Sequence, residues 1–315
     1  MHVVLFNFTM LVIRSLGIIF ILLSSFSTRA ENNADTILIQ KHLSFLTNSS
    51  LFRTHSNPQR LNQVADYIQS VFERYSDSVF VQSFEAGGNV YRNVICSFGT
   101  ENEERIIVGA HYDVCENQEG ADDNASGVAG LLELARMFQG QKLNYRIDLV
   151  AYSLEEPPYF RKESMGSFVH AKSLADNNSK VFGMVSLEMI GYLSDEKKSQ
   201  SYPLGVLSLF YGNKGNYITL VRKFGAGKFA RKFCRKFKSS KVIRTKKFSG
   251  PSSLPGIDFS DHLNYWKFGF SAMMITDTAF YRNKNYHKPT DTMETLDLIR
   301  MARAIDGVFI TLTSL

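Results

Sequence analysis

Apolar residues recur along this chain at two spacings, and the alternation of these spacings defines its predicted elements. Apolar positions three and four residues apart predict helices over 37–46, 61–75, 127–138, 165–176 and 292–313. Short apolar runs between turn residues predict strands at SVFVQSF, NVICSF, RIIVGAH, RIDLVAYS, VFGMVSLEM, VLSLFYG and SAMMITD. Because strands and helices alternate, we expect an α/β domain with helices on both faces of one sheet.

Two local predictions concern a helix start and the cysteines. Asp291 and Glu294 have the spacing of an N-terminal cap for the last helix. If NVICSFG and RIIVGAH form a hairpin about Asn102, Cys96 lies opposite about Val108 and Cys115 lies beyond the pairing. A disulfide between these two cysteines is therefore not expected. No pair among the three cysteines, which include Cys234, has the spacing of a thiolate zinc site.

The first thirty residues have the composition of a secretory leader. They contain no acid, they carry Arg14 ahead of an apolar run over 16–26, and they end in Thr-Arg-Ala. We therefore expect a signal peptide over 1–30, a mature start near Glu31, and export to the periplasm or the extracellular space. A retained membrane anchor is the alternative, because residues 3–13 are also apolar.

Composition and charge change this picture little. A chain of 315 residues with 44% hydrophobic and 21% charged residues can bury a large core, so we expect one domain over 31–315. The formal charge falls from +6 to +4 when Arg14 and Arg29 leave with the leader. This mild excess gives no reason to expect a nucleic-acid partner.

The positive charge is concentrated in one segment, 222–247, which contains no acid. Phe229, Phe233 and Phe237 recur every fourth residue there and predict a helix with one apolar stripe. Weak contact with an anionic surface is one interpretation of the basic faces. The interpretation that we favour is a solvated helix whose phenylalanines pack on the domain.

Candidate chemistry first appears at the end of the strand RIIVGA. His111 follows this strand, and Asp113 lies two residues on, where its carboxylate can accept the second ring N–H and fix the tautomer. Asp122 precedes the helix over 127–138. By itself an aspartate at a helix start is more often a cap than a ligand.

Three more acids and a second histidine occupy comparable positions. Glu155 and Glu156 end the strand at RIDLVAYS, and two adjacent carboxylates at a strand end point to different sides. Glu188 lies within an apolar strand, where an unpaired charge is costly and needs a cation. His287 lies in a loop after the strand that ends near 277.

Nitrogen and oxygen ligands of this kind suit zinc, and two zinc ions can share one carboxylate and one water. We assign His111 and Glu188 to one ion and Glu156 and His287 to the other. Neither pair is sufficient unless a carboxylate bridges, and Asp122 is assigned to that bridge. Glu155 remains as the general base, which takes a proton from the bridging water and passes it to the departing amine.

The residues carry a resemblance to a known family. The chain resembles the zinc-dependent aminopeptidases, relatives of glutamate carboxypeptidase and glutaminyl cyclase, in five segments that follow in the family's order. These segments are HYDVCENQEGADDNASG, SLEEPPYF, SLEMIGY, SDHLNYWKFGFSAMMITDTAFYRNKNYH and DTMETLD, and the likeness runs from about residue 58 to the C-terminus.

The resemblance implies an αβα sandwich around a mixed, mostly parallel eight-stranded sheet, two zinc ions, and peptide substrates with a free N-terminus. It places the ligands at His111, Asp122 as the bridge, Glu156, Glu188 and His287, with Glu155 as the base. The family often has aspartate where this chain has Glu188. The resemblance further implies a cis peptide bond between Asp122 and Asp123.

The segment SDH at 260–262 resembles part of the family's substrate pocket. Asp261 or His262 would hold the α-amino group of the substrate or polarise its carbonyl, and a cap on the following helix is an equal alternative. Segments 193–205 and 222–258 are expected to form the wall and rim of that pocket.

Two other functions share the fold. A glutaminyl cyclase would use one zinc ion to close an N-terminal glutamine, although GADDNASG and the paired Glu155 and Glu156 resemble the hydrolytic members more closely. A binding protein on an inactive peptidase scaffold is less favoured, because no ligand or base position is missing.

Overall fold

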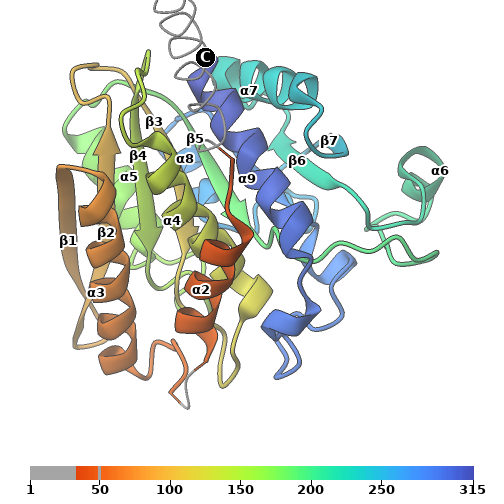
Figure 1. Cartoon of the computed structure of the whole chain (residues 1–315), viewed down its shortest axis with the longest axis horizontal. Coiled ribbons are helices and arrows are strands. Elements are labelled where there is room, and N and C mark those ends of the chain that lie inside the picture. The colour runs from red at the N-terminus through yellow and green to blue at the C-terminus, as the bar shows by residue number, and fades with distance from the viewer. Residues whose placement is uncertain (1–32, 49–50) are drawn as a thin grey trace, which may run out of the picture. The chain divides into compact units, whose positions relative to one another are not determined.

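The computed structural model describes residues 33–48 and 51–315, of which Ala34–Leu315 form one compact unit. One eight-stranded sheet runs through this unit in the order β1-β2-β4-β3-β5-β8-β6-β7 (Figure 1). The strands are β1 Ser78–Ala86, β2 Asn89–Phe98, β3 Arg105–His111, β4 Arg146–Tyr152, β5 Val181–Glu188, β6 Ile218–Lys223, β7 Thr245–Gly250 and β8 Ala272–Thr276. Neighbours are antiparallel in β1/β2, β2/β4 and β6/β8 and parallel in the other four pairs. The predicted mixed, mostly parallel sheet is confirmed.

Helices cover both faces of the sheet. The α-helices are α2 Thr36–Thr47, α3 Pro58–Tyr75, α4 Gly127–Phe138, α5 Gly166–Asp176, α6 Leu207–Tyr211, α7 Gly227–Ser240, α8 His262–Lys267 and α9 Leu298–Thr313, and a π-helical turn, η1, spans Ala121–Ser126. Helices α2, α3, α4, α7 and α9 contact one another in one layer, and α5 contacts α8 on the other face (Figure 1). This three-layer arrangement is the predicted αβα sandwich.

Side chains of the central strands alternate between these two layers. In β3, Ile106 and Val108 join the core beneath the larger helical layer, whereas Ile107 joins the core beneath α5 and α8. A strand that is buried on both faces reads as a continuous apolar run, which explains why RIIVGAH was recognisable. Strands β4, β3 and β5 are adjacent and parallel, so their carboxyl ends meet at one edge of the sheet.

The predicted hairpin between NVICSFG and RIIVGAH is wrong. Strand β2 pairs with β1 and β4, and Cys96 lies opposite Leu149 rather than Val108. The turn that follows β2 therefore leads β3 past β4 to its far side. Cys96, Cys115 and Cys234 are all free thiols, so the expected absence of a disulfide between Cys96 and Cys115 is confirmed.

Two further local predictions are corrected. The segment VLSLFYG contains the short helix α6 and no strand, on a part of the chain that projects from the domain (Figure 1). Helix α9 starts after Asp297, whose side chain accepts the N–H of Arg300. Asp291 does not cap α9, and its carboxylate instead accepts backbone N–H groups of Asp122 and Asp123 in η1.

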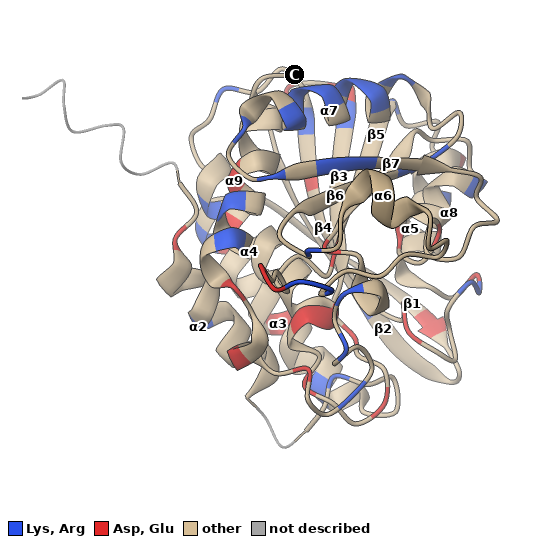
Figure 2. Ribbon diagram, turned by 90° about the vertical axis from the view of Figure 1, so that its right-hand side faces the viewer, with Lys and Arg blue, Asp and Glu red and all other residues tan. Residues whose placement is uncertain are grey.

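The basic segment 222–247 forms the end of β6, helix α7 and the start of β7. Phe229, Phe233 and Phe237 are buried in the main core, which confirms that the apolar stripe packs on the domain. Lysines and arginines lie along the outer face of α7 and along β7 (Figure 2). The favoured interpretation of this segment, a solvated helix, agrees with these positions.

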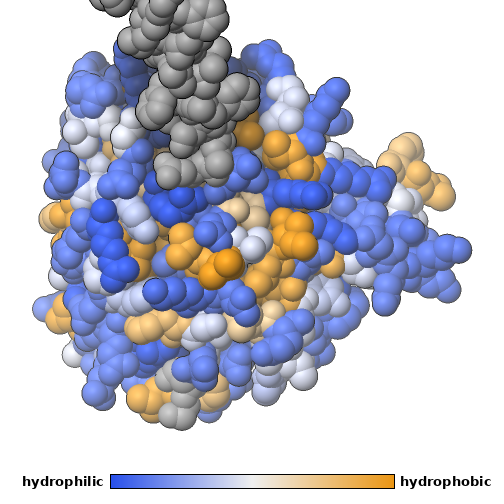
Figure 3. Space-filling model, in the orientation of Figure 1, coloured by the Kyte–Doolittle hydropathy of each residue, from blue (hydrophilic) through white to orange (hydrophobic). Residues whose placement is uncertain are grey.

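One exposed apolar feature lies on α6, in the part of the chain that projects from the domain. Leu209 and Phe210 of α6 are 81% and 79% exposed, and they form an apolar tip at the side of the molecule (Figure 3). None of the helices within 33–48 and 51–315 has the length and apolar character needed to cross a membrane. The predicted leader and its cleavage point lie outside the described residues.

Candidate metal centre

The carboxyl ends of β3 and β5 bring the first pair of site residues together. His111 ends β3 and Glu188 ends β5, the next strand in the sheet. His111 Nε2 lies 3.4 Å from a carboxylate oxygen of Glu188. His111 is 1% exposed and Glu188 6%, so both are removed from bulk water.

Asp123, in the turn before α4, lies between the two histidines that the sequence singled out. One of its carboxylate oxygens is 3.5 Å from His111 Nε2, and the other is 3.1 Å from His287 Nε2. Glu156 joins the second histidine, with 3.3 Å between its carboxylate oxygen and His287 Nε2. The arrangement has two halves, His111 with Glu188 and His287 with Glu156, and Asp123 faces both.

Asp122 does not lie between the histidines, in contrast to the prediction. Its carboxylate accepts the backbone N–H of Gly191 at 3.0 Å and the side-chain amide of Asn283 at 2.8 Å. The cis peptide bond is likewise one residue later than expected, between Asp123 and Asn124. Adjacent side chains in the turn point to different sides. Asp122 therefore bonds to Gly191 and Asn283, and its neighbour Asp123 faces the histidines.

Several buried groups hold this turn in place. The side chain of Asn124 donates to the carbonyl of Leu187 and accepts the N–H groups of Gly127 and Met189. Asp291 accepts the N–H groups of Asp122 and Asp123 from the other side. The position of the Asp123 carboxylate is therefore fixed by bonds to the ends of α4 and β5. No sequence signal pointed to Asn124 or to this use of Asp291.

Asp113 connects the histidine to the glutamate pair. Its side chain lies 3.5 Å from His111 Nδ1, whose nearer contact is the Asp113 carbonyl oxygen at 3.2 Å. The two carboxylate oxygens accept the backbone N–H groups of Glu155 at 3.1 Å and Glu156 at 3.0 Å. Asp113 thus orients one ring and fixes the backbone that carries two carboxylates, as partners of ligands commonly do.

The segment SDH is only partly at the site. Ser260, which the sequence did not single out, donates to a carboxylate oxygen of Glu188 at 2.8 Å. His262 Nε2 lies 2.8 Å from the carbonyl oxygen of Ile257, and its ring packs edge-on against Trp266. Asp261 is fully buried, and burial raises its pKa to about 7, an effect that His111 opposes and Glu188 reinforces.

The electrostatics show a buried excess of acid. Burial is the largest cause that raises the pKa of Glu155 well above its usual range and that of Glu156 to about 7, with Asp123 adding to the second effect. Burial alone would lower the pKa of His287, but the carboxylates of Asp123 and Glu156 raise it to about 10. Negative groups at this density favour any bound cation.

The available ligand atoms fit zinc. Asp123 Oδ2, Glu156 Oε1 and His287 Nε2 are buried atoms that make no regular hydrogen bond in the described structure, although Asp123 Oδ2 and His287 Nε2 lie 3.1 Å apart. One ligand atom from each of His111, Asp123 and Glu156 can be chosen so that all lie within 4.8 Å of one another. Imidazole nitrogen and carboxylate oxygen are ordinary zinc ligands, and the unpartnered atoms are those that a metal would satisfy.

Comparison with known proteins decides the class of this site. The family model that matches the chain, over residues 93–311, is that of peptidase family M28. The chain belongs to peptidase family M28. The match contains every residue of the candidate centre, from His111 to His287, and it confirms the resemblance stated from the five sequence segments.

Relatives of this M28 peptidase include both an uncharacterised protein and named peptidases. YfbL of Escherichia coli (strain K12), an uncharacterised protein, is 42% identical over 278 residues, which cover 86% of this chain and 85% of YfbL. A probable leucine aminopeptidase of Trichophyton verrucosum is 26% identical over 66% of this chain. The match covers 53% of that fungal protein.

Solved structures agree on the fold. The LapA aminopeptidase of Legionella pneumophila superposes with a TM-score of 0.69 at 18% identity, covering 89% of this chain and 71% of LapA. A glutaminyl cyclase of Fimbriiglobus ruber superposes with a TM-score of 0.68 at 18% identity, covering 89% of this chain and 95% of the cyclase. A protein named as an aminopeptidase and one named as a glutaminyl cyclase therefore share this fold.

An apolar pocket opens beside Glu188 in the M28 fold. Its lining includes Val221, Phe248, Ile257, Phe259 and Met274, together with Leu207 and Tyr211 of α6. The expected wall and rim segments, 193–205 and 222–258, both contribute residues, and β6, β8 and residues 278–281 contribute others. A pocket of this composition accepts an apolar side chain.

Proposed function

We propose that this M28 peptidase is an aminopeptidase that uses two zinc ions. His111 and Glu188 would hold one ion, Glu156 and His287 the other, and Asp123 would bridge them. The observation that carries this proposal is the position of the Asp123 carboxylate, with its two oxygens 3.5 Å and 3.1 Å from the two different histidines. A carboxylate placed in this way serves two ions better than one.

The two ions would activate a water molecule and polarise the scissile carbonyl. We assign the proton transfers to Glu155, whose backbone is fixed by Asp113 and whose carboxyl group is 7% exposed at the site. Glu155 takes a proton from the attacking water and gives it to the departing amine, so that it ends the reaction in its starting state. Glu156, held beside His287, stays a ligand throughout.

The substrate would be a peptide with a free N-terminus and an apolar first side chain. The resemblance to aminopeptidases, and a relative with the printed name of a probable leucine aminopeptidase, support the free N-terminus. The apolar pocket beside Glu188 would accept the first side chain. Asp261 is fully buried, so we assign it an electrostatic effect on the site rather than direct contact with the substrate. We assign no role in binding to His262.

The test is amine release from a panel of aminoacyl-arylamides, free and N-acetylated, by protein that starts at Glu31. We expect release from free leucyl, phenylalanyl and methionyl substrates, none from their acetylated forms, and loss of release with a zinc chelator. Restoration by zinc, together with two bound ions per chain, would complete the case. Equal release from acetylated substrates would contradict an aminopeptidase.

Glutaminyl cyclase activity is the second candidate, because cyclases superpose on this chain as well as aminopeptidases do. The test is product analysis on a peptide with an N-terminal glutamine. Loss of ammonia with the peptide intact would indicate a cyclase, and release of free glutamine a peptidase. Carboxylates of Asp123, Glu156 and Glu188 lie beside the two histidines, so a ligand set for two ions is present and we expect hydrolysis. For the same reason we do not favour an inactive binding scaffold.

We also propose export and weak contact with anionic surfaces. The composition of residues 1–30 supports export, and the exposed side chains of Lys228, Arg231, Arg235 and Lys238 on α7 support the surface contact. Cell fractionation with N-terminal sequencing tests the first. Co-sedimentation with anionic and neutral vesicles at two salt concentrations tests the second, and binding that ignores both charge and salt would contradict it.

A further inference from the structure

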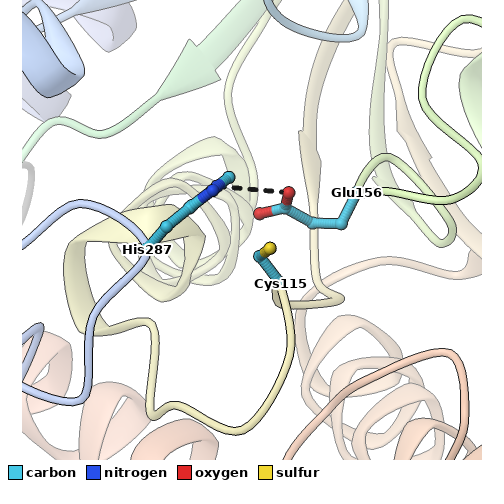
Figure 4. A group of neighbouring side chains, drawn as sticks. All are labelled: Cys115, Glu156 and His287. Atoms are coloured by element: carbon cyan, nitrogen blue, oxygen red, sulfur yellow. Dashed lines mark ion pairs between the residues drawn. The ribbon is translucent and has the colours of Figure 1, made fainter.

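Cys115 lies beside one half of the candidate metal centre. It belongs to the loop between β3 and η1, and its thiol is on the same side as the carboxylate of Glu156 and the ring of His287 (Figure 4). One ligand atom of each of these three residues lies within 4.8 Å of the other two. This thiol has no part in the function proposed above.

The loop holds Cys115 in this position. The guanidinium group of Arg53 donates to the carbonyls of Tyr112 at 2.9 Å and Gly120 at 3.0 Å, near the two ends of the loop. The N–H of Val114 donates to the carbonyl of Arg53 at 2.9 Å. The backbone next to Cys115 is therefore fixed, and the thiol moves chiefly by rotation about its own side-chain bond.

The neighbours of the thiol independently indicate a ligand. Glu156 is 4% exposed, and its Oε1 is a buried atom without a hydrogen-bond partner. His287 Nε2 makes no regular hydrogen bond either, although it lies 3.3 Å from the other carboxylate oxygen of Glu156, and Figure 4 shows these two side chains pointing toward each other beside the thiol. Buried polar atoms without partners are rare in folded proteins and often mark a missing ion.

We propose that Cys115 is an additional ligand of the ion held by Glu156 and His287, an inference that rests on the function proposed above. Zinc binds sulfur at about 2.3 Å and nitrogen or oxygen at about 2.0–2.2 Å, so ligand atoms around one ion lie about 3.3–3.8 Å apart. A separation within 4.8 Å closes to this range with a modest side-chain rotation. On binding, the thiol releases its proton to solvent.

With this additional ligand, the ion beside His287 would have no open coordination position. Asp123, Glu156, His287 and Cys115 together supply four protein ligands, whereas a catalytic zinc site keeps one position open. With sulfur bound, the ion is held more tightly and the position needed by water or substrate is filled. Substrate or a thiol reagent that displaces Cys115 would reopen that position, so the thiol acts as an internal inhibitor.

The first experiment replaces zinc by cobalt, whose bond to a thiolate gives a near-ultraviolet charge-transfer band. Metal-free protein is titrated with Co²⁺ in the wild type, in Cys115→Ser, and in Cys234→Ala, which removes a buried thiol of the core. We expect the band by two equivalents of Co²⁺ in the wild type and in Cys234→Ala, and none in Cys115→Ser. Two bound cobalt ions without the band in the wild type would overturn the proposal.

The second experiment needs no variant. Cys96 and Cys234 are buried and Cys115 is partly exposed, so alkylation of the native protein reports on Cys115. We expect two equivalents of zinc to slow this alkylation at least about tenfold relative to the metal-free protein, since a ligated sulfur is a poor nucleophile. An unchanged rate at full zinc occupancy would overturn the proposal even if Cys115→Ser fails to fold.

The two proposals fail in different ways. If the protein binds no ion, or if both the wild type and Cys115→Ser bind two ions and release no amine from any substrate, the proposed function fails. If it binds two ions and is an active peptidase, but shows neither the sulfur band nor protection from alkylation, only the role of Cys115 fails. A second-ion affinity that falls at least about tenfold in Cys115→Ser would give independent support.

Discussion

Two neighbouring aspartates in the turn before α4 have different surroundings. Asp123 faces both histidines, and Asp122 accepts hydrogen bonds from Gly191 and Asn283. We expect Asp123→Asn to lower affinity for at least one zinc ion, and with it peptidase activity, at least about a hundredfold. Asp122→Asn should keep two ions and chiefly reduce stability. Metal titration of both variants decides between them, and the reverse result would restore Asp122 as the bridge.

Glu155 is the residue on which the proposed chemistry depends. Glu155→Gln has nearly the same shape but cannot carry a proton, so we expect kcat to fall about 10²- to 10⁴-fold with KM and zinc content little changed. Glu85→Gln, a change on the edge strand β1, is the matched control and should have no effect. Unchanged kcat in Glu155→Gln would remove this residue from the mechanism.

At the residue scale the sequence predicted most of the centre but not its bridge. His111, Glu156, Glu188 and His287 were recognisable because each follows or ends an apolar strand, where a polar side chain is unexpected. Asp122 and Asp123 offer no such signal, because both precede the same helix. Which of the two faces the histidines depends on Asn124 and on the distant Asp291, whose contacts no local pattern contains.

At the scale of elements, burial decided what could be predicted. Strands β3, β4 and β5, which carry three parts of the centre, have buried faces on both sides and read as apolar runs. The sequence did not predict β6 or β7. For β7 the reason is its position as a half-exposed edge strand with two adjacent lysines. The segment VLSLFYG has the apolar run of a buried strand, but it forms the short helix α6, none of whose residues is buried.

Helix α5 carries a buried histidine that makes stability depend on pH. Burial lowers the pKa of His170 to about 4, from 6.5 in an exposed histidine. As pH falls from 7 to 5 the unfolded chain gains a proton that the folded chain does not, so stability is lost by about 2 kcal/mol. We expect urea unfolding of His170→Gln to show a smaller loss over this range.

Asn177→Ala, a change of an exposed, non-titrating side chain at the C-terminal end of α5, is the control for this comparison and should lose as much stability as the wild type between pH 7 and 5. His42 and His262 have pKa values lowered to about 4 for the same reason, so some acid sensitivity should remain in every single variant. Identical pH dependence in His170→Gln and the wild type would contradict the argument.

At the scale of the whole molecule, the centre links metal content to stability. Ions that bind only the folded chain stabilise it by about 2.7 kcal/mol at a hundred times their dissociation constant, which is about 5–10 °C in Tm for a domain of this size. We expect a chelator to lower Tm by this amount and zinc to restore it. Magnesium should not substitute, because it prefers a shell of oxygen ligands. A Tm that does not change when a chelator is added would argue against occupied sites in the folded protein.

His111 and His287 come from opposite halves of the sequence, and Asp123 meets both only when the last strand and its loop have joined the sheet. During synthesis His111 is made long before His287. A nascent or truncated chain therefore holds one histidine without its counterpart, and by the mechanism proposed above it would not cleave the peptides around it. The proposed centre is complete only once nearly all of the chain has been made and folded.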